Sequence, residues 1–236
     1  MSDKVKNWYE HLNKDLKREP KLDKNYKKHY IQPNSMICCI GGTGSGKSNS
    51  LVDFLSRKNE AFYDIIVFSG STTDEPLLNM LKSKMPDIRM YNDINEFPPL
   101  SEFDDEDKDK EKLFICDDFI SLNKKDQKKI QEYLVAGRKF GFTVWCMAQD
   151  YKSVPKVITR NLHYIIMFKL NDNVSINNII RNHNIHGTDK ETFKKHYIDA
   201  TSEPRQFFLI DMKGKPETHL RKNFLNFYPK SDIKAS

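Results

Sequence analysis

A glycine-rich octapeptide, Gly-Gly-Thr-Gly-Ser-Gly-Lys-Ser at positions 41–48, restricts the fold of this 236-residue chain more than any other feature of its sequence. The pattern Gly-x4-Gly-Lys-Ser carries structural meaning only where a strand precedes it and a helix follows it. The apolar run 36–40 predicts that strand, buried on both faces of a parallel sheet. Four apolar residues at helical spacing between positions 51 and 55 predict a helix that begins near Lys47.

A loop of this kind is suited to the phosphates of a nucleoside triphosphate. Its glycines let backbone N–H groups approach the phosphates closely, and the following helix adds the positive end of its dipole. Lys47 is expected to reach the β and γ phosphates, and Ser48 to place its hydroxyl on Mg²⁺. The alternative is a glycine-rich turn without a ligand. The predicted nucleotide-binding residues are Gly41, Gly42, Thr43, Gly44, Ser45, Gly46, Lys47, Ser48 and Asn49.

Two adjacent carboxylates follow the predicted strand 113–116. Carboxylates side by side repel each other, so a buried strand that ends in two of them suggests a chemical role. Asp117 is the predicted Mg²⁺ ligand, and Asp118 the residue that orients and deprotonates an attacking water. Gln149 ends the predicted strand 142–148, next to the strand of the carboxylates, where its amide would contact the γ phosphate or the water. An ordinary loop residue is the other interpretation of Gln149.

Charge that develops on the phosphates usually calls for an arginine, and the candidates are Arg138 and Arg160. Arg138 lies between a predicted amphipathic helix and the strand 142–148. If its side chain points outward, it cannot reach its own phosphate loop and would serve the next subunit of a ring. For both arginines an ordinary surface cation is the competing interpretation.

Strands and helices alternate along the middle of the chain, which predicts an α/β fold with a parallel sheet. A second strand is predicted at 64–69, a short helix around Val157, a fifth strand at 164–168, helices at 173–182 and 189–200, and a late strand at 206–211. Residues 70–112 contain four prolines and are predicted to be irregular. The expected organisation is a basic N-terminal arm at 1–30, an ATPase core at 31–170, and at 171–236 a C-terminal extension of helices and strand that packs on the core and ends in a basic tail.

Composition adds weaker constraints. The net charge is +6, and residues 1–30 hold nine Lys and Arg against five Asp and Glu, with Trp8 and Tyr9 among them. This segment is either a solvated arm that packs its aromatics on the core or a basic surface for DNA or a neighbouring subunit. The four cysteines lie in predicted strands without a CxxC pair, so buried reduced thiols are expected. No apolar run approaches the ~20 residues that cross a bilayer.

The ordered series of motifs resembles the FtsK–HerA superfamily, and within it the poxvirus-like genome-packaging ATPases of large DNA viruses and virophages. The similarity covers about residues 31 to 170. The glycine–arginine segment is more selective than the phosphate loop, which many families share. The segments that carry the resemblance are Gly41–Ser48, Phe114–Asp118, Gly137–Gln149, Val154–Pro155 and Arg160–Asn161.

This resemblance implies a RecA-like P-loop NTPase core of the ASCE class, with a central, mostly parallel sheet flanked by helices. It implies hydrolysis of ATP with Mg²⁺, coupled to packaging of double-stranded viral DNA into a capsid. The implied assembly is a homo-oligomeric ring, pentamer or hexamer, on the capsid vertex in the host-cell cytoplasm (the virus factory), with the virion as a second location and no membrane required. It also implies an arginine supplied in trans, which fits Arg138.

One residue departs from the pattern of the related motors. They often carry glutamate as the second carboxylate, whereas this chain has Asp118, one methylene shorter. Its role as a base is therefore less secure than the Mg²⁺ role of Asp117. Two other functions use a phosphate loop: a small-molecule or nucleoside kinase, and a nucleotide switch with slow turnover. The carboxylate pair with Gln149 favours hydrolysis over a kinase, and the switch is an alternative that a single-turnover assay decides.

Overall fold

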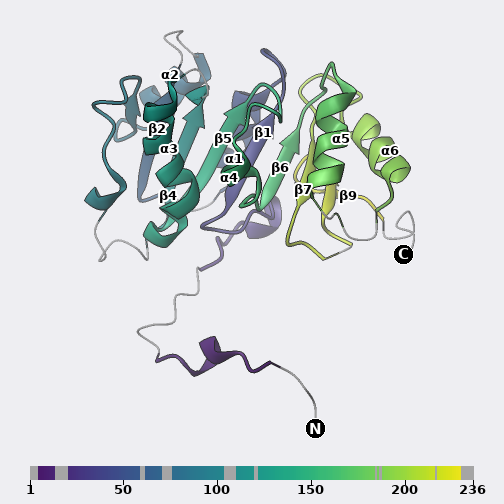
Figure 1. The fold of residues 1–236 in the computed structure, drawn as a ribbon, viewed down its shortest axis with the longest axis horizontal. Coiled ribbons are helices and arrows are strands. Elements are labelled where there is room, and N and C mark those ends of the chain that lie inside the picture. The colour runs from purple at the N-terminus through teal and green to yellow at the C-terminus, as the bar shows by residue number, and fades with distance from the viewer. Residues whose placement is uncertain are drawn as a thin grey trace.

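The fold was analysed in a computed structural model, which describes residues 5–13, 21–58, 62–70, 76–103, 110–119, 122–183, 185, 188–215 and 217–229. The described residues form one nine-stranded sheet in the order β3-β2-β4-β5-β1-β6-β7-β8-β9, parallel from β3 to β6 and antiparallel from β6 onward (Figure 1). The strands are β1 (Met36–Ile40), β2 (Asp64–Ser69), β3 (Arg89–Tyr91), β4 (Lys112–Asp117), β5 (Phe142–Ala148), β6 (Tyr164–Met167), β7 (Phe208–Asp211), β8 (Leu220–Lys222) and β9 (Asn226–Phe227). The predicted α/β fold with a mostly parallel central sheet is confirmed.

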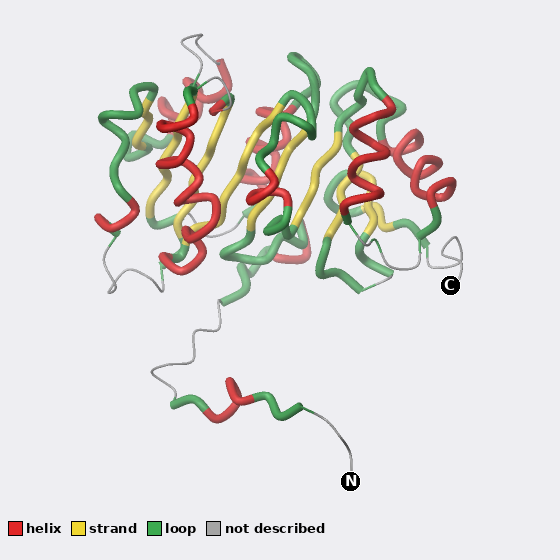
Figure 2. The backbone as a smooth tube through the Cα atoms, in the orientation of Figure 1, coloured by secondary structure: helices red, strands yellow, loops and turns green. Residues whose placement is uncertain are grey.

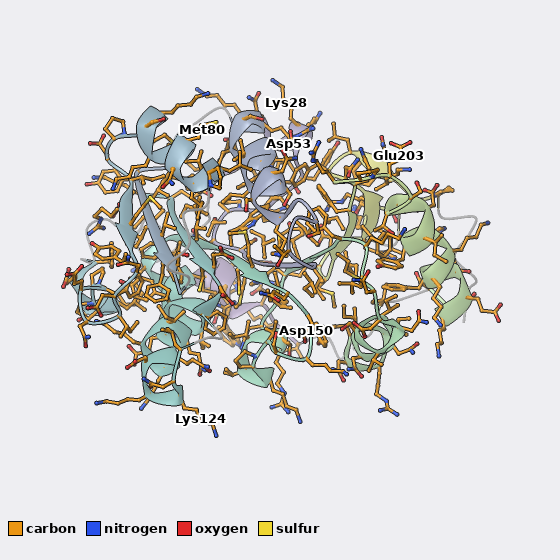
Figure 3. All side chains as sticks on the ribbon, turned by 90° about the horizontal axis from the view of Figure 1, so that it is seen from above. Lys28, Asp53, Met80, Lys124, Asp150 and Glu203 are labelled. Atoms are coloured by element: carbon orange, nitrogen blue, oxygen red, sulfur yellow. The ribbon has the colours of Figure 1, made fainter. Side chains whose placement is uncertain are left out.

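Helices cover both faces of the sheet (Figure 2). They are α1 (Lys47–Arg57), α2 (Pro76–Lys84), α3 (Lys124–Ala136), α4 (Lys156–Thr159), α5 (Asn173–Asn182) and α6 (Lys190–Ala200). Figure 3 looks down on the sheet edge and shows Asp53 of α1 and Met80 of α2 on one side, and Lys124 of α3 on the other. Side chains alternate along each strand, so Cys38 packs with the α3 layer and Cys39 with the α1 layer.

Most predicted elements are present, but the prediction of an irregular segment at 70–112 was wrong in part. The segment contains helix α2 and edge strand β3, which pairs in parallel with β2. Pro76 stands at the first position of α2, where the missing N–H costs nothing, so it starts a helix rather than breaking one. Leu78 and Leu81 then pack into the same buried cluster as α1. Residues 71–75 and 104–109 of this segment lie outside the described residues.

The predicted late strand is present as β7, but the stretch expected to be a basic tail forms β8 and β9 as well. Arg221 of β8 is 1% exposed. Its guanidinium donates to Asp211 at 2.6 Å, to the Thr218 carbonyl at 3.1 Å and to the His29 carbonyl at 3.3 Å. The charge of Arg221 therefore joins the C-terminal strands to the segment before β1 and is not available on the surface. Residues 230–236 lie outside the described part of the chain.

The four cysteines are buried and unbridged, as expected: Cys38, Cys39, Cys116 and Cys146. Within the described residues, no helix is long and apolar enough to cross a bilayer. In the N-terminal segment, Trp8 and Tyr9 are 68% and 80% exposed, so these two aromatics do not pack on the core. Residues 1–4 and 14–20 of the predicted arm lie outside the described residues.

Candidate functional site: a nucleotide cleft at the carboxyl ends of the strands

Four parallel strands end at one level, and we call this side of the sheet the carboxyl edge. Ile40 of β1 pairs with Ala148 of β5 and Met167 of β6, while Asp117 of β4 pairs with Met147 of β5. The residues that follow these strands emerge side by side for that reason. Strand β5 lies between β1 and β4, so the predicted neighbourhood of the strands that carry Gln149 and the carboxylates is confirmed.

A cavity of about 500 Å³ opens at the carboxyl edge, above the ends of β1, β4 and β5. It brings together most of the predicted phosphate loop, both carboxylates and Gln149, together with four residues that the sequence did not suggest: Leu77, Met147, Ala148 and Arg205. The lining residues are Thr43, Gly44, Gly46, Lys47, Ser48, Asn49, Leu77, Asp117, Asp118, Met147, Ala148, Gln149 and Arg205. Gly41, Gly42 and Ser45 belong to the same loop but do not line the cavity.

The phosphate loop depends on glycine at two close approaches. Gly46 caps α1 in a left-handed conformation with φ of 111°, and a Cβ there would lie 3.2 Å from the Phe168 ring. A Cβ at Gly41 would lie 2.5 Å from the Ser45 hydroxyl. The buried Ser45 hydroxyl has no hydrogen-bond partner among the described residues. The Lys47 ammonium folds back on the loop and donates to the carbonyls of Gly41, at 2.7 Å, and Gly42, at 3.1 Å.

The two carboxylates are half-buried at the end of β4. Asp117 is the last residue of the strand, and its carbonyl accepts the Gly70 N–H at 2.9 Å. Asp118 has φ of 49°, a left-handed backbone that costs energy for a residue other than glycine and that clusters at functional sites. With the Ser48 hydroxyl they form the hard oxygen set that Mg²⁺ accepts. The described residues contain no cluster of three His, Cys, Asp or Glu that could hold a metal alone, so phosphate and water oxygens would complete the shell.

Gln149 follows β5 directly and is exposed into the cavity. Arg205 reaches the same cavity from the turn between α6 and β7. The sequence carries no local motif for Arg205. Its placement follows from the antiparallel return of β7 beside β6, which pairs Phe208 with Met167 and so brings the preceding turn to the carboxyl edge.

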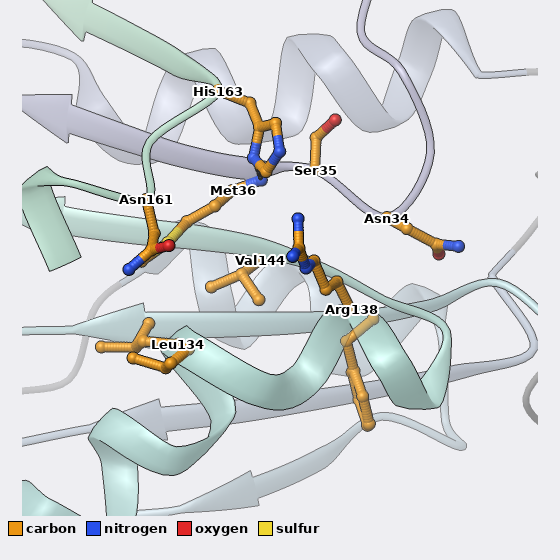
Figure 4. Close-up of a pocket in the computed structure, with 10 residues that line it drawn as sticks. Asn34, Ser35, Met36, Leu134, Arg138, Val144, Asn161 and His163 are labelled. Carbon is orange, nitrogen blue, oxygen red and sulfur yellow. Dashed lines mark hydrogen bonds between the residues drawn. The ribbon is translucent and has the colours of Figure 1, made fainter. Parts of the chain in front are cut away.

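Arg138 and Arg160 lie at the opposite side of the sheet, which we call the amino edge. Arg138 belongs to the 3₁₀ helix Gly137–Phe140 directly before β5, and Arg160 follows α4, before β6. Both side chains are exposed. A strand of the length of β5 spans roughly 20 Å, so Arg138 is far from the phosphate loop of its own chain. Figure 4 shows its guanidinium directed into a small pocket toward Ser35 and His163.

His163 is neutral at pH 7. Its Nδ1 accepts the Met36 N–H at 3.0 Å, which fixes the residue before β6 to the start of β1. Burial first, and then the positive charges of Lys213 and Arg138, lower the pKa of His163 to about 4. A cavity of about 740 Å³ lies beside this pocket, and Arg138, Lys213 and Lys215 are among its lining residues. The amino edge is therefore basic and holds no phosphate loop.

Comparison with known proteins identifies the family of this chain and other proteins that share its fold. The sequence profile of the family described as Poxvirus A32 protein matches residues 23–211. No curated protein sequence matches the chain. Among solved structures, the chain is similar to B204, the DNA-packaging ATPase from Sulfolobus Turreted Icosahedral Virus, with a TM-score of 0.55 at 15% identity over 82% of this chain and 98% of that chain.

Two further structures share the fold. The genome packaging NTPase B204 from Sulfolobus turreted icosahedral virus 2, in complex with ATP-gammaS, gives a TM-score of 0.55 at 15% identity over 80% of this chain and 96% of that chain. EssC (ATPases 2 and 3) from Geobacillus thermodenitrificans gives 0.51 at 13% identity over 86% of this chain and 41% of that chain. At these identities the likeness shows a common fold.

Proposed function

This chain belongs to the poxvirus A32 protein family, and from that premise we propose that it is an ATP-hydrolysing motor that moves viral double-stranded DNA into a capsid. It is an ATPase of viral DNA packaging, and it binds ATP. The observation that carries the proposal is the cleft at the carboxyl edge, where a phosphate loop faces two carboxylates and a glutamine. A phosphate loop alone serves kinases and switches, whereas this polar set suits activation of a water molecule.

Five polar residues of the cleft have a role in hydrolysis. Lys47 would exchange its carbonyl partners for the β and γ phosphates, and Ser48 and Asp117 would hold Mg²⁺. When bound, Mg²⁺ neutralises the charge on the phosphate oxygens. Asp118 accepts a proton from the attacking water, and the Gln149 amide holds that water in line with the γ phosphate.

The positive charge that assists transfer of the γ phosphate to water comes from a second copy of the chain. Arg138 lies at the amino edge, far from its own cleft, and is directed toward a pocket rather than into an ion pair. A subunit that sets its amino edge on the carboxyl edge of the next makes a head-to-tail contact, and repetition of that contact closes a ring. Arg138 is favoured over Arg160 because it lines both amino-edge cavities.

The partners follow from the same function. The motor acts on DNA as an oligomer, and we infer a homo-oligomeric ring of five or six subunits on the capsid vertex, in the cytoplasm of the host cell where the virus assembles and then in the virion. The net charge of +6 suits binding to the phosphate backbone without dependence on base sequence.

The decisive experiment measures phosphate release from ATP with and without double-stranded DNA. We expect DNA to raise the rate, the stimulation to weaken as salt increases from about 50 to 200 mM, and Lys47→Ala to lower the rate about 10²- to 10³-fold. Lys124→Ala, at an exposed lysine of α3 on a face of the sheet away from the cleft, is the matched control and should keep the wild-type rate (Figure 3).

Other outcomes would assign a different function. Transfer of the γ phosphate to an acceptor instead of release as free phosphate would identify a kinase. Tight nucleotide binding with a single slow turnover would identify a switch. A rate indifferent to DNA, with no DNA binding at low salt, would remove the motor.

A further inference from the structure

A fixed turn places Arg205 in the nucleotide cleft of its own chain. The turn joins the end of α6 to β7, and its far end is anchored by Phe207, which is 3% exposed. The Phe207 ring packs between Phe168, at 5.6 Å, and Phe224, at 5.1 Å. Its backbone exchanges two hydrogen bonds with Asn223: the N–H donates to the side-chain oxygen at 3.1 Å, and the carbonyl accepts the Asn223 N–H at 2.9 Å.

The Arg205 backbone contacts the phosphate loop directly. If Gly46 had a Cβ, that atom would lie 3.3 Å from both Cα and Cβ of Arg205. Arg205 itself holds a left-handed conformation with φ of 65°, which is unfavourable for a branched or long residue unless the surroundings impose it. The side chain is exposed and lines the cavity, and the described residues offer it no hydrogen bond or ion pair. A cation is thus held beside an anion-binding loop without a protein partner in the described chain.

The strand order decides which phosphates Arg205 faces. The carboxylates and Gln149 come from β4 and β5, on one side of β1, whereas the turn of Arg205 comes from β6 and β7, on the other side. In a phosphate loop the Mg²⁺ and γ-phosphate end lies with the lysine and the carboxylates, and the backbone N–H groups hold the α and β phosphates. Gly46, which Arg205 contacts, belongs to that backbone.

We propose that Arg205 binds the α and β phosphates of the nucleotide in cis, as a charged clamp on the side of the loop opposite the carboxylates. The proposal rests on the proposed function only in that the cleft binds ATP. Because ATP and ADP share these two phosphates, the contact stabilises substrate and product alike. It therefore acts on affinity and not on the chemical step, which distinguishes Arg205 from Arg138.

The test is a titration of ATP and ADP, without DNA, on wild-type protein, Arg205→Gly and Arg205→Lys. Glycine removes the guanidinium and accepts the left-handed backbone without strain, so the turn is preserved. We expect Arg205→Gly to weaken ATP and ADP equally, by about 10- to 100-fold, with kcat at saturating ATP within about threefold of wild type. Arg205→Lys, which keeps the charge but loses the forked donor, should recover part of the affinity.

Arg181→Ala is the matched control, because Arg181 is an exposed arginine of α5 that does not line the cleft. It should bind both nucleotides as wild type does, and thermal unfolding without nucleotide should show that each variant is folded. Unchanged ADP affinity in a folded Arg205→Gly variant would overturn the proposal, as would a fall in kcat at constant affinity. The two proposals can fail separately. If DNA does not stimulate ATP hydrolysis but Arg205→Gly still weakens ADP binding, the packaging function is rejected and the role of Arg205 in binding the α and β phosphates stands.

Discussion

The two ends of the parallel strands, the carboxyl edge and the amino edge, carry different sets of functional groups. The carboxyl edge carries a phosphate loop, two carboxylates and Gln149, but the arginines predicted to assist the chemistry are absent from it. The amino edge carries Arg138 and Lys213 around a neutral His163, but its described residues form no phosphate loop and no pair of adjacent carboxylates. Each edge holds what the other is missing, which is the arrangement expected of a site shared between two copies of the chain.

This comparison also separates two uses of arginine. Arg205 stands at the carboxyl edge in contact with its own phosphate loop, where it can bind nucleotide in an isolated subunit. Arg138 stands roughly 20 Å away along β5, too far to contact a nucleotide in its own cleft, and its proposed role is in the cleft of a neighbour. Loss of one should change affinity, and loss of the other should change turnover.

The largest effect is expected from Arg138→Ala. An arginine supplied in trans stabilises charge that exists only in the transition state, so kcat should fall by about 10³- to 10⁵-fold while the affinity for ATP stays near wild type. The measurement is steady-state ATP hydrolysis in assembled protein, with nucleotide binding followed in parallel. A loss of less than about tenfold would leave Arg138 as an ordinary surface cation.

Assemblies that mix Arg138→Ala subunits with Asp117→Ala subunits test the same prediction more directly. Asp117→Ala subunits lack the Mg²⁺ ligand but keep Arg138, so each variant supplies what the other has lost. In an equal mixture about a quarter of the interfaces should join an intact cleft to an intact arginine, and activity should recover in proportion. If properly assembled mixtures stay inactive, Arg138 of one subunit does not reach the nucleotide cleft of the next.

A smaller loss is expected at the carboxyl edge from Asp118→Asn. Asparagine tolerates the left-handed backbone of Asp118 but cannot accept a proton, so kcat should fall about 10²- to 10⁴-fold with ATP affinity retained. Asp118→Glu is the matched control, because it keeps the carboxylate and restores the residue common in related motors. An asparagine variant that hydrolyses ATP at the wild-type rate would remove Asp118 as the base.

The carboxyl edge could be predicted from sequence because its residues are local signals. A strand buried on both faces is a short apolar run, and a polar residue that ends such a run must emerge at the edge, as Asp117 and Gln149 do. Adjacent parallel strands then place these ends together without further information. The roles of Arg138 and Arg160 remain predictions, since they depend on a second copy of the chain.

The missed features depend on contacts distant in sequence. Strands β8 and β9 contain three and two residues, too few to show the alternation of apolar and polar residues that marks a strand. Arg221 is buried, but it lies in a lysine-rich stretch that resembles an exposed tail. Helix α2 was missed because Pro76 was interpreted as a breaker, although at a first helical position proline favours the helix. Arg205 reaches the cleft only because β7 returns antiparallel to β6, and no residue near position 205 specifies that pairing.

The smallest expected effect is on stability, and it comes from the titration of His163 at the amino edge. The folded-state pKa of His163, about 4, lies below its ordinary value of 6.5, so the unfolded chain binds the proton more readily between those pH values. Above pH 6.5 both states are neutral and the group has no effect; as pH falls from 6.5 toward 4, the free energy of unfolding should decrease.

His163→Gln retains an acceptor for the Met36 N–H but cannot titrate, so its thermal midpoint should decline less over this range than that of wild type. Parallel curves for the two proteins would show that His163 is already accessible to protons in the folded state. A flatter curve for the variant would show that burial, with the charges of Lys213 and Arg138 as smaller contributions, keeps His163 unprotonated in the folded state.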